Sequence, residues 1–206
     1  MKFLAVLGLS AVLLTGCGGP STSVSPSVSP SVSPSVSPSV SPSVSPSGTS
    51  SDCAAVQQDW AAGGISSDWS GANLINCDLS GASLGEGKFV GADLSGADLS
   101  GANLFVADLS NANLTGANLT DAISISLLLE GANLTDASLT GVVFESGYFS
   151  GANFTRANFT NATLLVADLT GADLTGTNFT NVAFFEVKMP DGTVRYDNCG
   201  PPYCVP

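Results

Sequence analysis

Large hydrophobic residues recur at every fifth position between Leu74 and Phe184, and Ser124 is the one polar residue in that register. A small residue, usually Ala, stands two positions before each of them. Asp or Asn usually lies in between and Ser or Thr usually follows, as in ADLSG at positions 92–96. A period of five fits neither an α-helix nor a β-strand. A fixed repeat of this kind predicts a solenoid, in which each unit packs only on its neighbours.

These units resemble the pentapeptide-repeat family over residues 67–191, which hold 25 units of five residues. The resemblance implies an all-β fold, a right-handed quadrilateral β-helix in which four units make one square coil of 20 residues. About six coils, stacked at ~4.8 Å, give a rod roughly 30 Å long. The Leu or Phe and the preceding small residue are expected to point inward, and the other three residues outward.

Both ends of an open β-helix expose unpaired backbone groups and need caps. Residues 51–66 are predicted to form an N-terminal cap with a short helix, which Gly63 and Gly64 end. Residues 187–194 read as a pair of strands around a Pro-Asp-Gly turn. Residues 192–206 are predicted to form a C-terminal cap or tail.

Two units depart from the pattern in a way that supports the inward orientation. Phe89 and Phe149 have Gly87 and Gly147 two positions earlier, where most units have Ala. A dense core demands such compensation of volume, so the missing methyl group is expected to make room for the larger ring.

A coil of 20 residues sorts the outward positions into columns of residues 20 apart. Two faces carry little besides Ser, Thr, Asn, Asp and Gly, and the apolar exceptions fall on the other two. They could expose roughly 400–600 Å² of apolar surface, as much as a monomer normally shows. The sequence predicts an interaction face made of Phe105, Val106, Ile123, Ile125, Leu128, Val143, Tyr148, Leu165, Val166 and Phe185. It serves a second copy or another protein, unless the tail 190–206 covers it.

Charged residues also share columns. Lys88 and Asp108 are 20 positions apart, as are two further pairs, Asp168 with Lys188 and Asp136 with Arg156. Pairs across neighbouring strands at a surface are worth about 0.2–1 kcal/mol. They are predicted to support the register of the coils.

The N-terminal region is predicted to direct export and anchoring. Residues 1–16 have the positive start and short apolar run of a signal peptide. The sequence Leu-Thr-Gly-Cys at 14–17 resembles the lipobox of bacterial lipoproteins, which implies cleavage before Cys17 and acyl chains on it. The alternative is an ordinary secretory signal. Gly18 in place of Asp favours the outer membrane if the cell has two membranes.

Residues 17–50 form a low-complexity linker, in which Ser-Val-Ser-Pro repeats six times between residues 23 and 46. Regular proline blocks helix and sheet hydrogen bonding, and scattered valine cannot build a core. We expect a disordered stalk that reaches at most roughly 100 Å as polyproline II.

Four cysteines remain besides Cys17, an even number in a chain predicted to be exported. The favoured pairing is Cys53 with Cys77 and Cys199 with Cys204, because Cys77 takes an inward slot beside the predicted cap. Free buried thiols are the alternative. A zinc site of four thiolates is disfavoured, because it would have to join both ends of the rod.

Composition excludes several functions. The chain has no histidine, so Ser-His-Asp and Cys-His nucleophile systems and histidine-ligated metals are impossible. A formal net charge of -12 argues against binding nucleic acid through a basic surface. The glutamates on the irregular faces, Glu86, Glu130, Glu145 and Glu186, are candidates for a glycan-acting carboxylate pair, but a convex rod provides no cleft.

The sequence therefore predicts a non-enzyme, with no cofactor and no metal, that acts as a lipid-anchored scaffold or protein-interaction module of the cell envelope. The family resemblance implies one alternative, since its best-known members mimic DNA and protect topoisomerases from quinolones. The predicted export argues against that role here.

Overall fold

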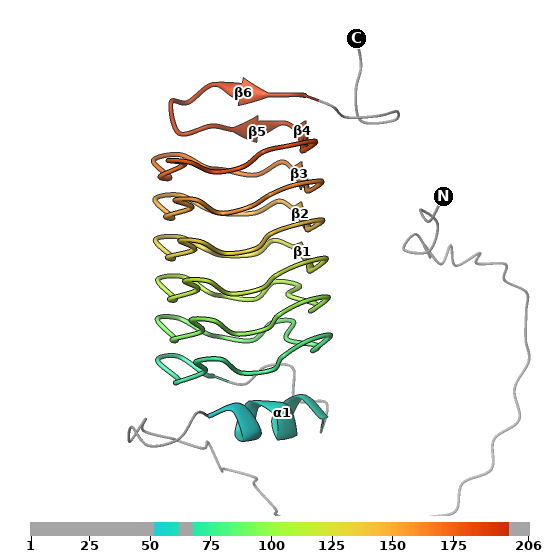
Figure 1. Ribbon diagram of the computed structural model, residues 1–206, viewed down its shortest axis with the longest axis vertical. Coiled ribbons are helices and arrows are strands. Elements are labelled where there is room, and N and C mark those ends of the chain that lie inside the picture. The colour runs from blue at the N-terminus through green and yellow to red at the C-terminus, as the bar shows by residue number, and fades with distance from the viewer. Residues whose placement is uncertain (1–51, 62–67, 198–206) are drawn as a thin grey trace, which may run out of the picture. The chain divides into compact units, whose positions relative to one another are not determined.

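The computed structural model describes residues 52–61 and 68–197. The predicted signal peptide, Cys17, the linker, Cys199 and Cys204 lie outside the described residues. From residue 68 onward the backbone winds into stacked coils (Figure 1). The structure therefore tests the repeat, the helix before it and the strand pair after it.

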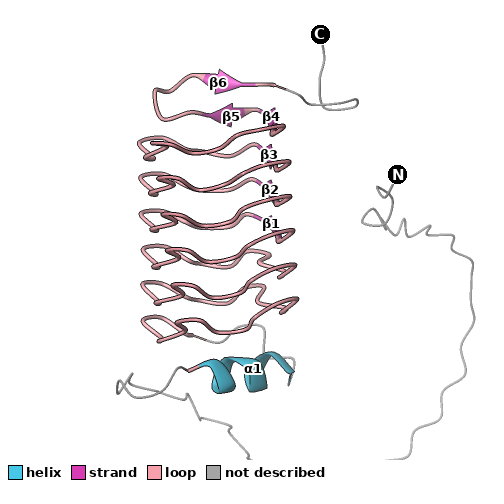
Figure 2. Cartoon of the chain, in the orientation of Figure 1, coloured by secondary structure: helices cyan, strands magenta, loops and turns pink. Residues whose placement is uncertain are grey.

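Consecutive coils pair in parallel with a register of 20 residues. Strands β1 (Ile123–Ile125), β2 (Val143–Glu145), β3 (Thr163–Leu165) and β4 (Ala183–Phe185) form a parallel sheet in the order β1-β2-β3-β4. Isolated parallel bridges with the same offset run from Asp68↔Lys88 to Asp168↔Lys188. Figure 2 shows the four strands one above another on one side of the stack. The predicted register is confirmed, whereas the handedness and the number of coils stay predictions.

A tight turn closes each unit. The backbone N–H of Ala72, for example, donates to the carbonyl of Trp69 at 3.0 Å, and Gly71 between them has a φ of 70°. The equivalent position has a positive φ in every unit from Gly71 to Glu186. Glycine, asparagine and aspartate tolerate this left-handed conformation, which explains why they dominate the fifth position of the repeat.

The Asp or Asn of each unit is a structural residue. Asn113 Oδ1 accepts hydrogen bonds from the backbone N–H of Thr115 at 3.2 Å and from its hydroxyl at 2.7 Å. Asp78 makes the same pair of bonds with Ser80, at 3.1 and 2.7 Å. Side chains that bond to the backbone two residues on are typical of Asx turns. Much of the acidic charge therefore belongs to the repeat itself.

These hydrogen bonds predict how stability depends on pH. The hydroxyl of Ser80 and then its backbone N–H lower the pKa of Asp78 from 3.8, and Thr175 does the same for Asp173. A carboxylate with a lowered pKa stabilises the fold fully above its unfolded pKa, and the effect is lost as pH falls through the folded pKa. We expect a nearly constant melting temperature from pH 7 to about pH 5 and a fall below about pH 4.

The matched variants replace Asp78 and Asp173 by Asn, which can accept the same bonds without titrating. Thermal unfolding at pH 3 and pH 7 should show a smaller acid loss in Asp78→Asn/Asp173→Asn than in the parent. An equal loss in both proteins would show that these carboxylates do not govern the acid sensitivity.

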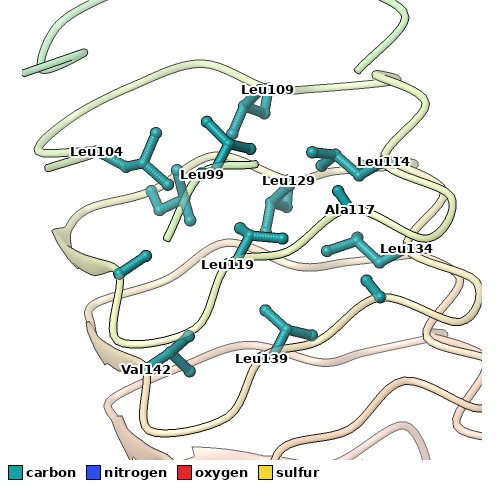
Figure 3. Close-up of a cluster of buried hydrophobic side chains, with 14 of the residues drawn as sticks. Leu99, Leu104, Leu109, Leu114, Ala117, Leu119, Leu129, Leu134, Leu139 and Val142 are labelled. Carbon is teal, nitrogen blue, oxygen red and sulfur yellow. The ribbon is translucent and has the colours of Figure 1, made fainter. Parts of the chain in front are cut away.

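Leucine, phenylalanine and alanine fill the interior (Figure 3). Six phenylalanine rings form a continuous chain of contacts from Phe144 to Phe184, with centroids 5.3–6.0 Å apart. Ser124 is buried, and its hydroxyl donates to the carbonyl of Leu104 at 2.6 Å. The predicted inward and outward positions are therefore confirmed.

The two glycines before phenylalanine make room for the ring. A Cβ placed at Gly147 would lie 2.2 Å from Cζ of Phe149, and one at Gly87 would lie 2.6 Å from Cε2 of Phe89. Real Cβ atoms essentially never show contacts under 3.0 Å. The expected volume compensation is confirmed.

Helix α1 (Cys53–Ala61) lies against the first coil. Asp52 donates its N–H to the carbonyl of Asn73 at 2.7 Å, and its carboxylate accepts the N–H of Asn73 at 2.9 Å. Gln57 Nε2 donates to the carbonyl of Asp78 at 2.6 Å. These bonds occupy backbone groups that the first coil would otherwise leave unpaired.

Strands β5 (Val187–Lys188) and β6 (Val194–Arg195) form an antiparallel pair, as the sequence predicts. The N–H of Phe184 donates to the carbonyl of Asp197 at 2.7 Å, and the Arg195 guanidinium lies 4.1 Å from the centroid of the Phe184 ring. Residues 194–197 therefore cover the last coil beside β4. No helix in residues 52–61 or 68–197 is long and apolar enough to cross a membrane.

Candidate functional site

The predicted interaction face lies on the side of the coils formed by β1–β4 (Figure 2). The pairing register places Ile125, Glu145, Leu165 and Phe185 in one column, and Ile123 beside Val143. Large exposed apolar side chains gather on this face and beside it. With their exposed fractions they are Ile123 49%, Tyr148 49%, Val166 47%, Phe105 43%, Val106 42% and Ile125 38%. The predicted residues Leu128, Val143, Leu165 and Phe185 are partly buried.

The tail reaches only one end of this face within the described residues. The ring of Tyr196 contacts Phe185 edge to face, with centroids 5.8 Å apart. Phe105, Val106 and Ile123 stay exposed. Up to Asp197, then, the alternative of a tail that covers the face holds at the β4 end alone.

Two valines on this face occupy a strained backbone position. Val106 and Val166 have φ values of 56° and 53°. A β-branched residue in the left-handed region is a steric outlier and costs on the order of 1–3 kcal/mol. Gly, Asn or Asp fills this position in nearly all units on the other faces. Two exposed valines that strain the backbone and fill no core indicate a surface role.

The strand face is poor in charge compared with the rest of the coils. Strands β1–β4 contain a single charged residue, Glu145. Elsewhere Asp and Asn alternate along the columns, as where Asn113 Nδ2 donates to Asp93 Oδ1 at 3.0 Å. The face is thus the part of an acidic surface that least repels another acidic molecule.

The predicted charge pairs form in two of three cases. Arg156 contacts Asp136 at 2.5 Å, and its hydrogen bonds lower the pKa of that carboxyl group. Lys188 contacts Asp168 at 3.6 Å. Lys88 bridges Asp108 through the backbone, but no ion pair involving Lys88 occurs in the described part of the chain. The structure adds Arg195–Asp197, which the column pattern misses because the tail makes it.

The candidate catalytic carboxylates do not form an enzyme-like site. Glu86, Glu130, Glu145 and Glu186 are all exposed. No group of three or more His, Cys, Asp or Glu side chains suitable for a metal occurs within residues 52–61 and 68–197.

Cys53 and Cys77 form a disulfide that links α1 to the first coil, with their Cα atoms 5.5 Å apart. Cys77 is buried in a slot that most units fill with Ala. The pairing of Cys199 with Cys204 lies outside the described residues and stays a prediction.

A family model described as pentapeptide repeats matches the sequence in eight copies, over residues 65–96, 88–123, 128–156 and 148–184. These segments cover more than half of the chain. The chain therefore belongs to the pentapeptide-repeat family, and its parallel sheet of stacked coils is the β-helix expected for that family.

Several solved structures of pentapeptide-repeat proteins are similar to this chain. HetL from the cyanobacterium Nostoc sp. strain PCC 7120, described as involved in heterocyst differentiation regulation, is 29% identical over 63% of this chain and 65% of its own, with a TM-score of 0.27. A protein from the Arabidopsis thaliana thylakoid lumen is 33% identical over 48% of this chain and 69% of its own, with a TM-score of 0.32.

QnrB1, described as a plasmid-mediated fluoroquinolone resistance protein, is 19% identical over 61% of this chain and 89% of its own, with a TM-score of 0.38. A comparison with curated protein sequences finds no match. The family is therefore assigned from the family model and the register of the coils.

Proposed function

We propose that this chain is a lipid-anchored, non-catalytic scaffold or interaction module of the bacterial cell envelope, which binds a protein through its apolar face. One observation carries the docking role. The exposed apolar side chains of residues 68–189 concentrate on and beside β1–β4, although polar side chains coat the neighbouring faces. An apolar patch of this kind on a polar surface marks an interaction site.

The sequence before the coils supports the anchor. A short apolar run ends at Cys17, and multiple acyl chains on one residue hold a protein stably at a membrane. The Pro-rich residues 17–50 then act as a spacer between the lipid and the coils. Anchor, spacer and face together describe a module that presents one surface at a fixed distance from the membrane.

The experiment places a photo-crosslinking amino acid at Phe105 in cells that make the full chain. We expect a crosslinked protein adduct in the envelope fraction. The matched control carries the crosslinker at Thr115, ten residues on and on a polar face, and should give none. In Cys17→Ser the lipid should be absent by mass spectrometry, and the chain should leave the envelope fraction.

Equal crosslinking from positions 105 and 115 would contradict docking through the face, and an unchanged location of Cys17→Ser would contradict the anchor. The alternative of a DNA-mimic that binds a topoisomerase predicts an unprocessed cytoplasmic chain instead. The apolar face weighs against it, because a mimic of DNA needs anionic groups there.

A further inference from the structure

We infer that the apolar face binds a second copy of this chain, antiparallel, about a two-fold axis that runs along the strand direction. The inference rests on the proposed docking role of this face and names its partner. Such a dimer is isologous, so the same patch must be complementary to itself. The order of residues along the columns meets this condition.

The corner column reads almost the same in both directions. Its six residues, one per coil, are Glu86, Val106, Ser126, Ser146, Val166 and Glu186. An antiparallel two-fold sets each column against itself in reverse order. Val106 then faces Val166 of the second copy, and Ser126 faces Ser146. The two strained valines thereby contact each other.

The neighbouring columns agree with the same axis. Phe105 faces Leu165 of the second copy, and Ile123 faces Val143. The apolar residues thus meet apolar residues in the middle of the interface, as in known protein interfaces. Glu145 is the exception, because it faces Ile125.

Charges at the two ends of the face complement each other. The first coil carries Glu86 and Lys88, and the last carries Glu186 and Lys188. In the antiparallel arrangement Glu86 approaches Lys188 of the second copy, and Lys88 approaches Glu186. Lys88 makes no ion pair within the described part of its own chain, so it is available for this contact. Complementary charges at a rim set register and orientation.

The size of the patch predicts a weak dimer. Stable interfaces bury ~800 Å² per partner, and roughly 400–600 Å² of apolar surface with a charged rim falls at or below the low end of that range. An acidic chain also repels its own copies. We therefore expect a dissociation constant in the micromolar range in dilute solution, and a higher occupancy where a shared membrane raises the local concentration.

The test is sedimentation velocity on the full chain carried as Cys17→Ser, which stays free of lipid. Phe105→Lys and Leu165→Glu should each weaken the dimer at least tenfold. The double variant Phe105→Lys/Leu165→Glu should restore it, because each new lysine faces a new glutamate of the second copy. Thr115→Lys/Thr175→Glu makes the same charge changes on a polar face and should leave the dimer unchanged.

Two further variants separate association from folding. Val106→Asn/Val166→Asn removes the apolar contact and relieves the left-handed strain, so the chain should melt no lower than the parent yet dimerise at least tenfold more weakly. Glu145→Leu should tighten the dimer, because a carboxylate facing Ile125 is unfavourable on burial.

Loss of the dimer in both single variants without rescue in the double variant would overturn the antiparallel arrangement. A monomer throughout the concentration range of the parent would overturn the second copy as partner. Crosslinking of position 105 to a different protein in cells would then leave the proposed docking function standing, whereas failure of both experiments would remove the face as a docking site.

Discussion

Gly147→Ala is expected to lower the free energy of unfolding by about 1–3 kcal/mol, as overpacking of a core does. The new Cβ would lie 2.2 Å from Cζ of Phe149 and under 3.0 Å from two more atoms of that ring. The ring has no room to retreat, because it is fully buried and contacts Phe144 and Phe154, with centroids 5.8 and 6.0 Å away. Urea denaturation followed by circular dichroism measures the loss.

A double-mutant cycle identifies the cause. Phe149→Leu alone leaves a cavity, but Gly147→Ala/Phe149→Leu rebuilds the small-residue and leucine pair of the usual unit. The double variant should be more stable than the sum of the single losses by about 1 kcal/mol or more. Gly87→Ala should cost less than Gly147→Ala, because its Cβ meets one atom of Phe89 below 3.0 Å. Additive single effects would refute the packing argument.

Removal of the Cys53–Cys77 disulfide is expected to cost about 3 kcal/mol, since a bridge across 24 residues restricts the unfolded chain to that extent. Cys53→Ala/Cys77→Ala tests this with little loss of packing, because alanine fills the equivalent inward slot in most units. Hydrogen exchange should rise first in α1 and the first coil, as the remaining ties there are the bonds of Asp52 and Gln57.

The control uses reductant on both proteins. Reduction of the parent should lower its stability by about the same amount as the double substitution, and should change the double variant little. A parent that is insensitive to reductant would show that the bridge does not stabilise the cap. Any shared residual effect of reductant would report on Cys199 and Cys204.

The repeat could be predicted from the sequence because period, burial and turn chemistry agree in every unit. Leu94 is buried, Asp93 accepts from the backbone of Ser95, and Gly96 takes the positive φ. The glycines before Phe149 and Phe89 were predictable for the same reason, since a dense core fixes the sum of neighbouring volumes.

The candidate site could be predicted only in part. Column arithmetic located Phe105 and Ile125, but it gave no backbone angles, so the strain at Val106 was missed. The fifth position of the repeat carried that signal, because a valine there replaces the usual glycine, asparagine or aspartate. The contact of Tyr196 with Phe185 depends on the path of the tail, which follows no repeat and could not be derived from spacing.

The central claim is that the β1–β4 face is covered in the working protein. Hydroxyl-radical footprinting of cell envelopes, compared with dilute purified chain, measures this directly. The account predicts that Phe105 and Tyr148 are oxidised several-fold more slowly in the envelope. Ile75, which is 40% exposed on another column, should react equally in both samples. Equal oxidation of Phe105 and Tyr148 in envelope and dilute solution would contradict the claim.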